Sequence, residues 1–186
     1  ISGENVAQLT LDGLLIAGRL RVSGSLSRLR LRHCTLVPGG GGSDTSTPPS
    51  LMVETPVKPL TIEIDHCIVG PLRLPAKAVV LQVRDSIIDA RAEERWALAA
   101  PDEGQLVPPT NLELADDQPA LAAAAKDPPA GPPTSLERVT VIGKVHVSEL
   151  TEVANTLITG QVLAERRQVG EVRFSALPKD SVTPRR

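Results

Sequence analysis

A histidine, carboxylate or amide side chain recurs at one place in a short repeated motif, immediately before a small residue. The members of this row are His33, His66, Asp85 and Asn155. Imidazole and carboxylate groups bind a metal only where two or three of them converge at one level. Asn and Asp also adopt the left-handed backbone conformation of tight turns and form local hydrogen bonds there. Because the histidines fall in different repeats, we interpret the row as turn geometry and predict no metal site.

Basic side chains form a second row, which offers a surface for anions. Its members are Arg21, Arg73 and His146, flanked by Arg19 and Lys144. On neighbouring parallel strands, like charges would lie about 4.8 Å apart and repel each other. Such a row is tolerated in water or beside an anion, so it is either a solvated face or a groove for an acidic polymer or a partner protein. With Trp96, these five residues make up the possible binding surface.

The residues predicted to point outward from strands offer few groups for catalysis. The acids Glu63, Asp65 and Asp85 are mixed with Arg84, whereas glycosidic cleavage or calcium binding needs converging carboxylates. The motifs G-x-S-x-G, H-E-x-x-H and G-x-x-x-x-G-K-[ST] do not occur in the sequence. We predict no catalytic, cofactor-binding or metal-ligating residue, and we favour a protein that is not an enzyme.

These side chains must be positioned by a repeat, which is clearest over residues 60–90. The motifs that start at Ile64 and Val83 share the order apolar, any, polar, small, apolar, apolar. A second motif, a glycine followed by an alternating strand, begins at Gly18, Gly70, Gly143 and Gly160. About three short strands per unit of roughly 20 residues are what a parallel β-helix needs. The sequence therefore predicts one all-β domain over residues 1–186, a single-stranded parallel β-helix (β-solenoid) with about three short strands per coil.

Proline and glycine interrupt the repeat twice. Residues 38–59 hold five prolines and a run of four glycines, and residues 91–135 hold eight prolines, which cannot donate to a strand ladder. We predict two long loop insertions there, with a short strand at 51–53 and one or two helical turns at 120–126. Trp96 either packs the second insertion onto the sheet or is an exposed residue that binds a partner. Residues 176–186 lack periodicity and are predicted to be a tail that lies across the last coil or leaves it.

The composition limits which residue types can form the core and which partners the chain can attract. The 186 residues include one Trp, one Phe and no Tyr, so the core must be aliphatic and platforms for stacking sugars or bases are scarce. The formal net charge of −2 gives no overall attraction to nucleic acid or anionic membrane. No run of 18 apolar residues could span a bilayer. The chain starts at Ile1 without a signal pattern, so we expect it to be part of a longer protein, and nothing indicates its localisation.

Two residue pairs give predictions about the interior. Cys34 and Cys67 occupy near-equivalent places in successive repeats. They are buried thiols stacked in a ladder, a disulfide, or a reactive pair, and we favour the first interpretation. Ile68 and Ile87 are predicted to face the core, so Ile68→Asp or Ile87→Asp should unfold the protein by burying an unpaired carboxylate.

Several segments resemble a set of uncharacterised bacterial proteins, some of them large, that are identified as right-handed parallel β-helix proteins. The segments are ERRQVGEVRFS at 165–175, TPRR at 183–186, LERVTV at 136–141 and IVGPLR at 68–73. The resemblance covers about residues 60–186 outside the second insertion. It implies a right-handed solenoid and, for some members, a connection with phage-tail-like particles. The family pattern has Cys where this chain has Glu171, and it supplies no catalytic residues.

Together these observations predict a non-catalytic structural or binding module, as part of a larger tail-like or surface assembly. Its partner is expected to be a protein or a second copy rather than a small molecule, with no cofactor and no nucleic acid. The alternative is an enzyme that acts on acidic polysaccharides, or a glycan binder, which uses Arg19, Arg21, Arg73 and Lys144 for uronate carboxylates.

Overall fold

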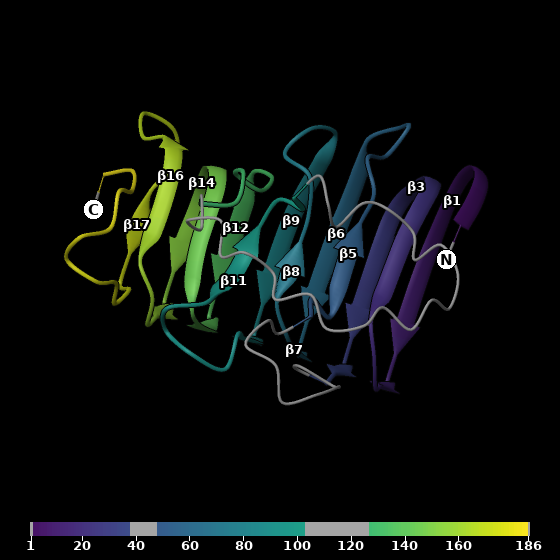
Figure 1. Cartoon of the computed structure of the whole chain (residues 1–186), viewed down its shortest axis with the longest axis horizontal. Coiled ribbons are helices and arrows are strands. Elements are labelled where there is room, and N and C mark those ends of the chain that lie inside the picture. Colours follow the sequence, from purple (N-terminus) through teal and green to yellow (C-terminus); the bar gives the residue numbers. More distant parts are fainter. Residues whose placement is uncertain (1, 38–47, 103–126, 186) are drawn as a thin grey trace, which may run out of the picture.

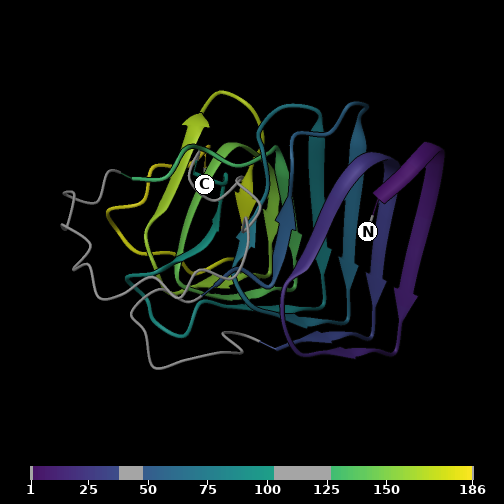
Figure 2. The ribbon, with the colours of Figure 1, turned by 45° about the vertical axis from the view of Figure 1, so that its right-hand side comes forward.

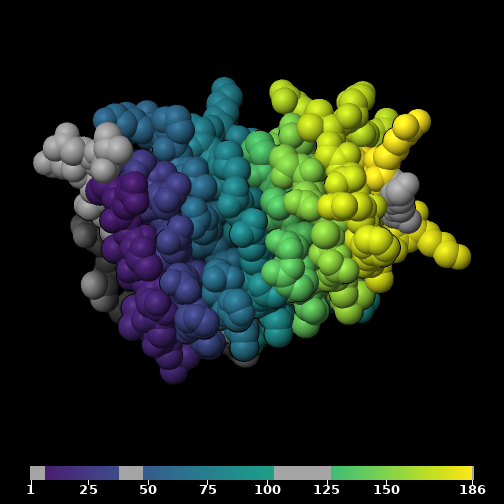
Figure 3. Space-filling model, turned by 180° about the vertical axis from the view of Figure 1, so that it is seen from behind, coloured from purple at the N-terminus to yellow at the C-terminus, as the bar shows by residue number. Residues whose placement is uncertain are grey.

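The computed structural model describes residues 2–37, 48–102 and 127–185. Within these ranges the chain forms 17 β-strands and no helix, which confirms the predicted all-β class. No helix in these ranges has the length and apolarity needed to cross a membrane. Figure 1 shows the long strands side by side, from β1 near the N-terminus to β17 near the C-terminus. Figure 3 shows the same order on the surface, as successive bands of colour.

The long strands and several short ones form one large sheet in which every pairing is parallel. Its strands are β1 (Ser2–Asp12), β3 (Leu20–Arg32), β5 (Leu51–Val53), β6 (Leu60–Asp65), β8 (Leu72–Arg73), β9 (Val79–Arg84), β11 (Trp96–Ala99), β12 (Thr134–Glu137), β14 (Lys144–Ala154), β16 (Val162–Arg166) and β17 (Val172–Arg173). The order β3–β5–β8–β11–β14–β12–β9–β6 returns to β3, so eight strands close a circuit. β1 extends this circuit beside β3, and β16 and β17 pair with β14.

The closed circuit overturns the predicted fold. In a single-stranded parallel β-helix, or β-solenoid, the strands of each coil belong to separate sheets, whereas the main sheet here is a closed barrel of eight parallel strands. The cause is the length of β3 and β14. β3 pairs with β5 through residues 20–22 and with β6 through residues 28–32, and β14 pairs in the same way with β11 and β12. Residues 20–32 and residues 144–154 were each expected to hold separate short strands. In the structure each segment is one continuous strand that bends along its length.

A second parallel sheet has six very short strands, which cross the bottom of the molecule in Figure 2. They are β2 (Leu15–Ile16), β4 (Thr35–Leu36), β7 (Ile68–Val69), β10 (Ile87–Asp89), β13 (Thr140–Ile142) and β15 (Leu157–Ile158). Val69 and Ile88 point inward and are fully buried, whereas Ile68 and Ile87 are 43% and 38% exposed. The prediction that Ile68 and Ile87 face the core is therefore wrong, because each strand turns its second residue inward.

The interior is aliphatic, as the composition predicts. Leucine, isoleucine and methionine supply the largest fully buried side chains among the described residues. On β3, Leu29 and Leu31 are buried while Arg30 and Arg32 reach solvent, which confirms the predicted alternation. Burying one such aliphatic side chain contributes about 1.5–3 kcal/mol, so stacked rows of them provide the main stabilisation of the fold.

A left-handed residue forms the corner between the large sheet and the six-stranded sheet in successive repeats. His33, His66, Asp85 and Asn155 all have positive φ, between 47° and 53°, which confirms the interpretation of this row as turn geometry. The same corner is formed by Gly13, Arg138 and Phe174, with φ of 68°, 55° and 50°. After glycine, Asn and Asp tolerate this conformation best. The histidines and Arg138 are held in it by backbone hydrogen bonds from their amides to the following repeat. We call these residues the corner row.

A small residue follows most corners and forms part of a side-chain ladder; Leu14 and Val139 stand in its place after Gly13 and Arg138. The amide N–H of Cys34 donates to Cys67 Sγ at 3.3 Å, and the amide N–H of Cys67 donates to Ser86 Oγ at 2.9 Å. Thr156 Oγ1 and Ser175 Oγ accept in the same way in later repeats. From Cys67 onward each thiol or hydroxyl thus satisfies an amide of an earlier repeat, and we call the series Cys34, Cys67, Ser86, Thr156 and Ser175 the small-residue ladder. Both cysteines are buried and free, so the prediction of stacked thiols is confirmed.

Both insertions contribute strands to the large sheet. β5 confirms the short strand predicted at 51–53. β11 lies inside the predicted loop 91–135 and pairs with β8 and β14, and β12 begins at Thr134. The loop prediction is therefore wrong over residues 96–99 and 134–135. The helical turns predicted at 120–126 lie outside the described residues. The C-terminal segment lies along the last repeat, because Ala176 bridges Leu157 and Val182 bridges Leu163.

Candidate functional site

The last residue before each corner belongs to an outward row whose charges alternate along the large sheet. In order of strand pairing the row reads Asp12, Arg32, Asp65, Arg84 and Glu137. Parallel strands lie about 4.8 Å apart, so each charge has its opposite on the neighbouring strand. Opposite charges that face each other across strands stabilise a sheet by about 0.2–1 kcal/mol per pair. We call these five residues the charged row.

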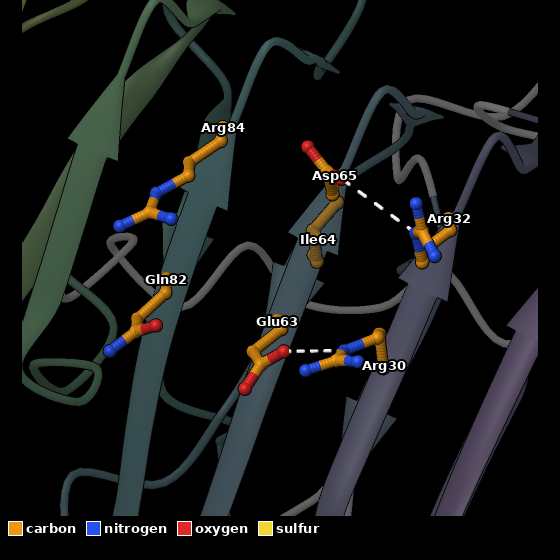
Figure 4. Close-up of a pocket in the computed structure, with 7 residues that line it drawn as sticks. All are labelled: Arg30, Arg32, Glu63, Ile64, Asp65, Gln82 and Arg84. Carbon is orange, nitrogen blue, oxygen red and sulfur yellow. Dashed lines mark hydrogen bonds and ion pairs between the residues drawn. The ribbon is translucent and has the colours of Figure 1, made fainter.

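Part of the charged row lines a hollow of about 390 Å³ on the outer face of β3, β6 and β9 (Figure 4). The lining residues are Arg30, Arg32, Glu63, Ile64, Asp65, Gln82 and Arg84. The side chain of Ile64 is buried, so the polar side chains form the walls. We call this feature the charged hollow; it combines three guanidinium groups with two carboxylates.

The carboxylates of the charged hollow have partners within the chain. Arg30 Nε donates to Glu63 Oε2 at 2.6 Å, and Arg28 Nε lies 3.4 Å from Glu63 Oε1. The hydrogen bond to Glu63 raises the pKa of Arg30. Asp65 lies 2.9 Å from His66 Nδ1 and 3.8 Å from Arg32 Nε. Both carboxylates of the charged hollow are therefore engaged with basic side chains of the same chain.

The corner row brings more ionisable groups next to the charged hollow. Arg138 holds Asp85 with two hydrogen bonds, of 2.6 Å from Nε and 2.9 Å from a terminal nitrogen. The bond from Arg138 holds the pKa of Asp85 below its usual range. The rings of His33 and His66 lie 5.2 Å apart between centroids. The corner row is therefore one contiguous series in space, although its members come from different repeats.

One group in this region has the composition of a metal site. Ligand atoms of Asp65, His66 and Asp85 lie within 4.8 Å of one another, although the sequence suggested that the histidines are too scattered. A cation there would compete with Arg138 for Asp85 and with Arg32 for Asp65. Two guanidinium groups already neutralise these carboxylates, so the arrangement is that of an ion-pair network rather than a metal centre.

The predicted basic row is interrupted by residues of the two insertions. Arg21 pairs with Met52, and Met52 with Arg73, which in turn pairs with Ala99. Arg21 and Arg73 are therefore two strand spacings apart, about 10 Å. Met52 and Ala99 are fully buried although they share the outward row, so this part of the sheet is covered rather than open. Arg21 forms an ion pair with Glu54.

Four of the six predicted binding residues do meet, around Trp96. Arg73 donates to the carbonyl oxygens of Leu72 at 2.9 Å and Trp96 at 3.1 Å, and burial lowers the pKa of Arg73 to about 10. Lys144 Nζ lies 5.4 Å from the Trp96 ring centroid, within range of a cation–π contact. The ring of His146 lies 6.0 Å from it. This cluster supports the interpretation of Trp96 as a packing anchor.

The remaining two predicted binding residues, Arg19 and Arg21, lie outside this cluster, and His146 has a further local role. Arg19 is exposed in the turn before β3. His146 Nδ1 donates to the carbonyl oxygen of Pro128 at 2.7 Å, which fixes the chain that returns from the second insertion. The basic residues thus do not form a continuous groove on the described surface.

Sequence reasoning missed Gln82, which lines the charged hollow, and Glu137 and Arg138, which extend the ion-pair network beside it. The signal was available, because Glu137 and Arg138 occupy the same two places in their repeat as Arg84 and Asp85 in theirs. An alignment of repeats by the residue before the corner would have shown the alternation of charge.

Comparisons with known proteins add no identification: no family model, no curated protein and no solved structure matches the chain. The resemblance to uncharacterised bacterial proteins therefore stays a prediction.

Proposed function

We propose that the protein is a non-catalytic structural or binding module that contacts a protein surface within a larger assembly. The proposal is supported by a contrast between two faces. On the large sheet, the ionisable side chains of the charged hollow form ion pairs with one another or with Arg28 and Glu137 beside it. On the six-stranded sheet, aliphatic side chains remain exposed to solvent.

The observation that carries the proposal is a row along that second face. Strand pairing places its six members in the order Leu15, Thr35, Ile68, Ile87, Thr140 and Leu157. We call this the aliphatic row. Its two leucines and two isoleucines are among the large apolar side chains that remain exposed. A contiguous exposed apolar patch on a soluble domain marks a contact surface more often than a catalytic one.

The nucleophiles of the described residues also favour a non-catalytic role. Both thiols are buried in the small-residue ladder, and burial raises the pKa of Cys67, which suppresses the reactive thiolate. The hydroxyls of Ser86 and Thr156 are occupied by backbone groups.

A glycan binder remains the second candidate, because one observation favours it. The Arg32 guanidinium reaches Asp65 only at 3.8 Å, and its side chain and that of Arg84 are 44% and 60% exposed beside the charged hollow. Guanidinium groups bind carboxylates in a bidentate manner, through two parallel hydrogen bonds. Uronate groups would therefore bind at Arg32 and Arg84, and not at the predicted basic row.

An acidic-glycan panel separates the two candidates. Polygalacturonate, alginate and hyaluronate fragments are assayed for unsaturated or reducing-end products with and without calcium, and for binding by calorimetry at two salt concentrations. We expect neither turnover nor saturable binding. Turnover would overturn the non-catalytic proposal. Salt-dependent binding that Arg32→Gln abolishes and Arg19→Gln retains would establish the glycan candidate in its place.

A further inference from the structure

Over its six strands, the aliphatic row has the same order of residue types in both directions; Ala176, which bridges Leu157, lies beyond its end. Read from β2 to β15 it is Leu, Thr, Ile, Ile, Thr, Leu, and it reads identically from β15 to β2. A two-fold axis that passes between β7 and β10 would therefore bring like residues together. Self-complementarity of this kind is what an isologous interface requires.

We propose that the six-stranded sheet is a homodimer interface, in which two copies pack face to face about a two-fold axis that lies in the interface and runs parallel to the strands. This inference rests on the proposed function and names the partner as a second copy of this chain. Leu15 of one copy faces Leu157 of the other, Thr35 faces Thr140, and Ile68 faces Ile87. Stacked sheets lie about 10 Å apart, with strand directions within about 30°.

Exposure along the row fits this arrangement. Leu15 is 74% exposed and Leu157 47% exposed, and the two isoleucines are 43% and 38% exposed. Together these four side chains expose about as much surface as two whole aliphatic side chains, and the threonines between them are half-buried. The face thus offers apolar surface along its whole length.

The charged residues at the two edges of the six-stranded sheet favour an axis parallel to the strands over an axis that runs across them. With the axis parallel to the strands, corner row meets corner row: His66 of one copy faces Asp85 of the other, and His33 faces Arg138. On the opposite rim, Gly70 faces Asp89 and leaves room for it, while Val37 faces Ile142. With the axis across the strands, Asp85 would face Asp89 of the other copy, and like charges placed opposite each other are destabilising.

The size of the face sets the strength of the dimer. Six strands extend the row over about 24 Å, and four residues of strand give a width of about 13 Å, or roughly 300–400 Å² per copy. A standard interface buries about 800 Å² per partner. We therefore expect a weak dimer, with a dissociation constant of about 10–500 µM.

Sedimentation velocity from about 10 µM to about 1 mM brackets this range. The weight-average sedimentation coefficient should rise with concentration for the parent. It should stay at the monomer value for Ile68→Asp/Ile87→Asp and for Leu15→Asp, the latter at the most exposed position of the row. The matched control is Val80→Asp, because Val80 is 43% exposed on β9 of the other sheet and should leave the dimer unchanged. Far-UV circular dichroism confirms that each variant is folded.

Crosslinking tests the axis. In the proposed dimer the Leu15 positions of the two copies lie about 24 Å apart along the row, whereas Leu15 and Leu157 face each other. An equimolar mixture of Leu15→Cys and Leu157→Cys should therefore crosslink with a short bismaleimide, and each variant alone should not. Efficient crosslinking of each variant alone would overturn the parallel axis.

A parent that stays monomeric at the highest concentration, or a Val80→Asp variant that dissociates as fully as the row variants, would overturn the interface itself. Neither result bears on catalysis, so the non-catalytic proposal would stand and only the identity of the partner would be lost. Turnover of a glycan, conversely, would leave the dimer untouched.

Discussion

The small-residue ladder gives the sharpest test of how this fold is held together, through the variant Ser86→Ala. Ser86 is 4% exposed, and its hydroxyl oxygen accepts the amide N–H of Cys67 at 2.9 Å. Removing the oxygen leaves a buried N–H without an acceptor, which costs about 1–3 kcal/mol of unfolding free energy. The hydroxyl also donates to the carbonyl oxygen of Arg84, but that oxygen keeps a second donor, the amide of His66 at 3.2 Å.

The chain supplies its own control for this variant. Cys67 stands one repeat before Ser86 in the ladder, and its sulfur accepts the amide of Cys34 at 3.3 Å. Ser86→Cys should therefore restore an acceptor and lose less than about 1 kcal/mol. Urea unfolding followed by far-UV circular dichroism measures both variants. With a slope of about 2 kcal/mol per molar urea, Ser86→Ala should lower the midpoint by about 0.5–1.5 M.

Two outcomes would contradict this reasoning. An unchanged midpoint for Ser86→Ala would mean that the amide of Cys67 finds another partner, so that the ladder adds no stability. An equal loss for Ser86→Cys would assign the effect to the shape of the side chain and not to the hydrogen bond.

Three further predictions concern the two sheets. Ile88→Asp should abolish cooperative thermal unfolding, because Ile88 is fully buried and an unpaired buried carboxylate costs several kcal/mol; Ile87→Asp, outward on the same strand, should keep the fold, and equal losses would place both residues in the core. Arg138→Gln should destabilise the protein at pH 5–7. The paired Asp85 has a lowered folded-state pKa, so its contribution is complete above the ordinary carboxyl pKa of about 3.9 and is lost as the pH falls through the lower folded value; a difference in urea midpoint that persists undiminished at pH 2 would refute this. The thiols should react with a disulfide reagent only after unfolding, since burial raises the pKa of Cys67; rapid labelling of the native protein would contradict their burial.

Sequence patterns predicted the strand alternation and the corner positions well, because these depend on local constraints. Alternation on β3 placed Leu29 and Leu31 in the core, and the polar residue before each small residue identified the left-handed corner. The equivalence of Cys34 and Cys67 followed from the same repeat and is confirmed by their contact. These features depend on a few neighbouring residues, so a single sequence is enough to show them.

The direction of two-residue strands could not be read from hydrophobicity alone. The strand at residues 68–69 is apolar at both positions, and so are the first two residues of β10. The small residue before each strand carries the missing information. Since Cys67 and Ser86 face inward after the corner, alternation turns the next residue outward, and Ile68 and Ile87 must be exposed.

The closure of the large sheet depends on tertiary structure that no local pattern encodes. β3 and β14 are each continuous through a bend where separate strands were predicted. In β3 the bend is made at Gly24, which has a φ of 88°. β11 lies between proline-rich segments, and two of its four residues are alanines, which do not favour strands intrinsically. It becomes a strand because β8 and β14 offer free edges on both sides.

In-register parallel stacking explains why the charged face is satisfied within the chain, whereas the aliphatic face still has apolar surface to bury. Each row places a residue next to its counterpart in the following repeat, so rows of aliphatic, thiol or hydroxyl groups gain from resembling their neighbours. Charges gain only by alternating, as Arg32, Asp65 and Arg84 do, and each exposed pair then contributes at most about 1 kcal/mol. The charged row is thereby satisfied along the stack and has little left to offer a ligand. The aliphatic row is satisfied along the stack as well, but its outer surface still faces water, and only a second apolar surface can remove it from solvent.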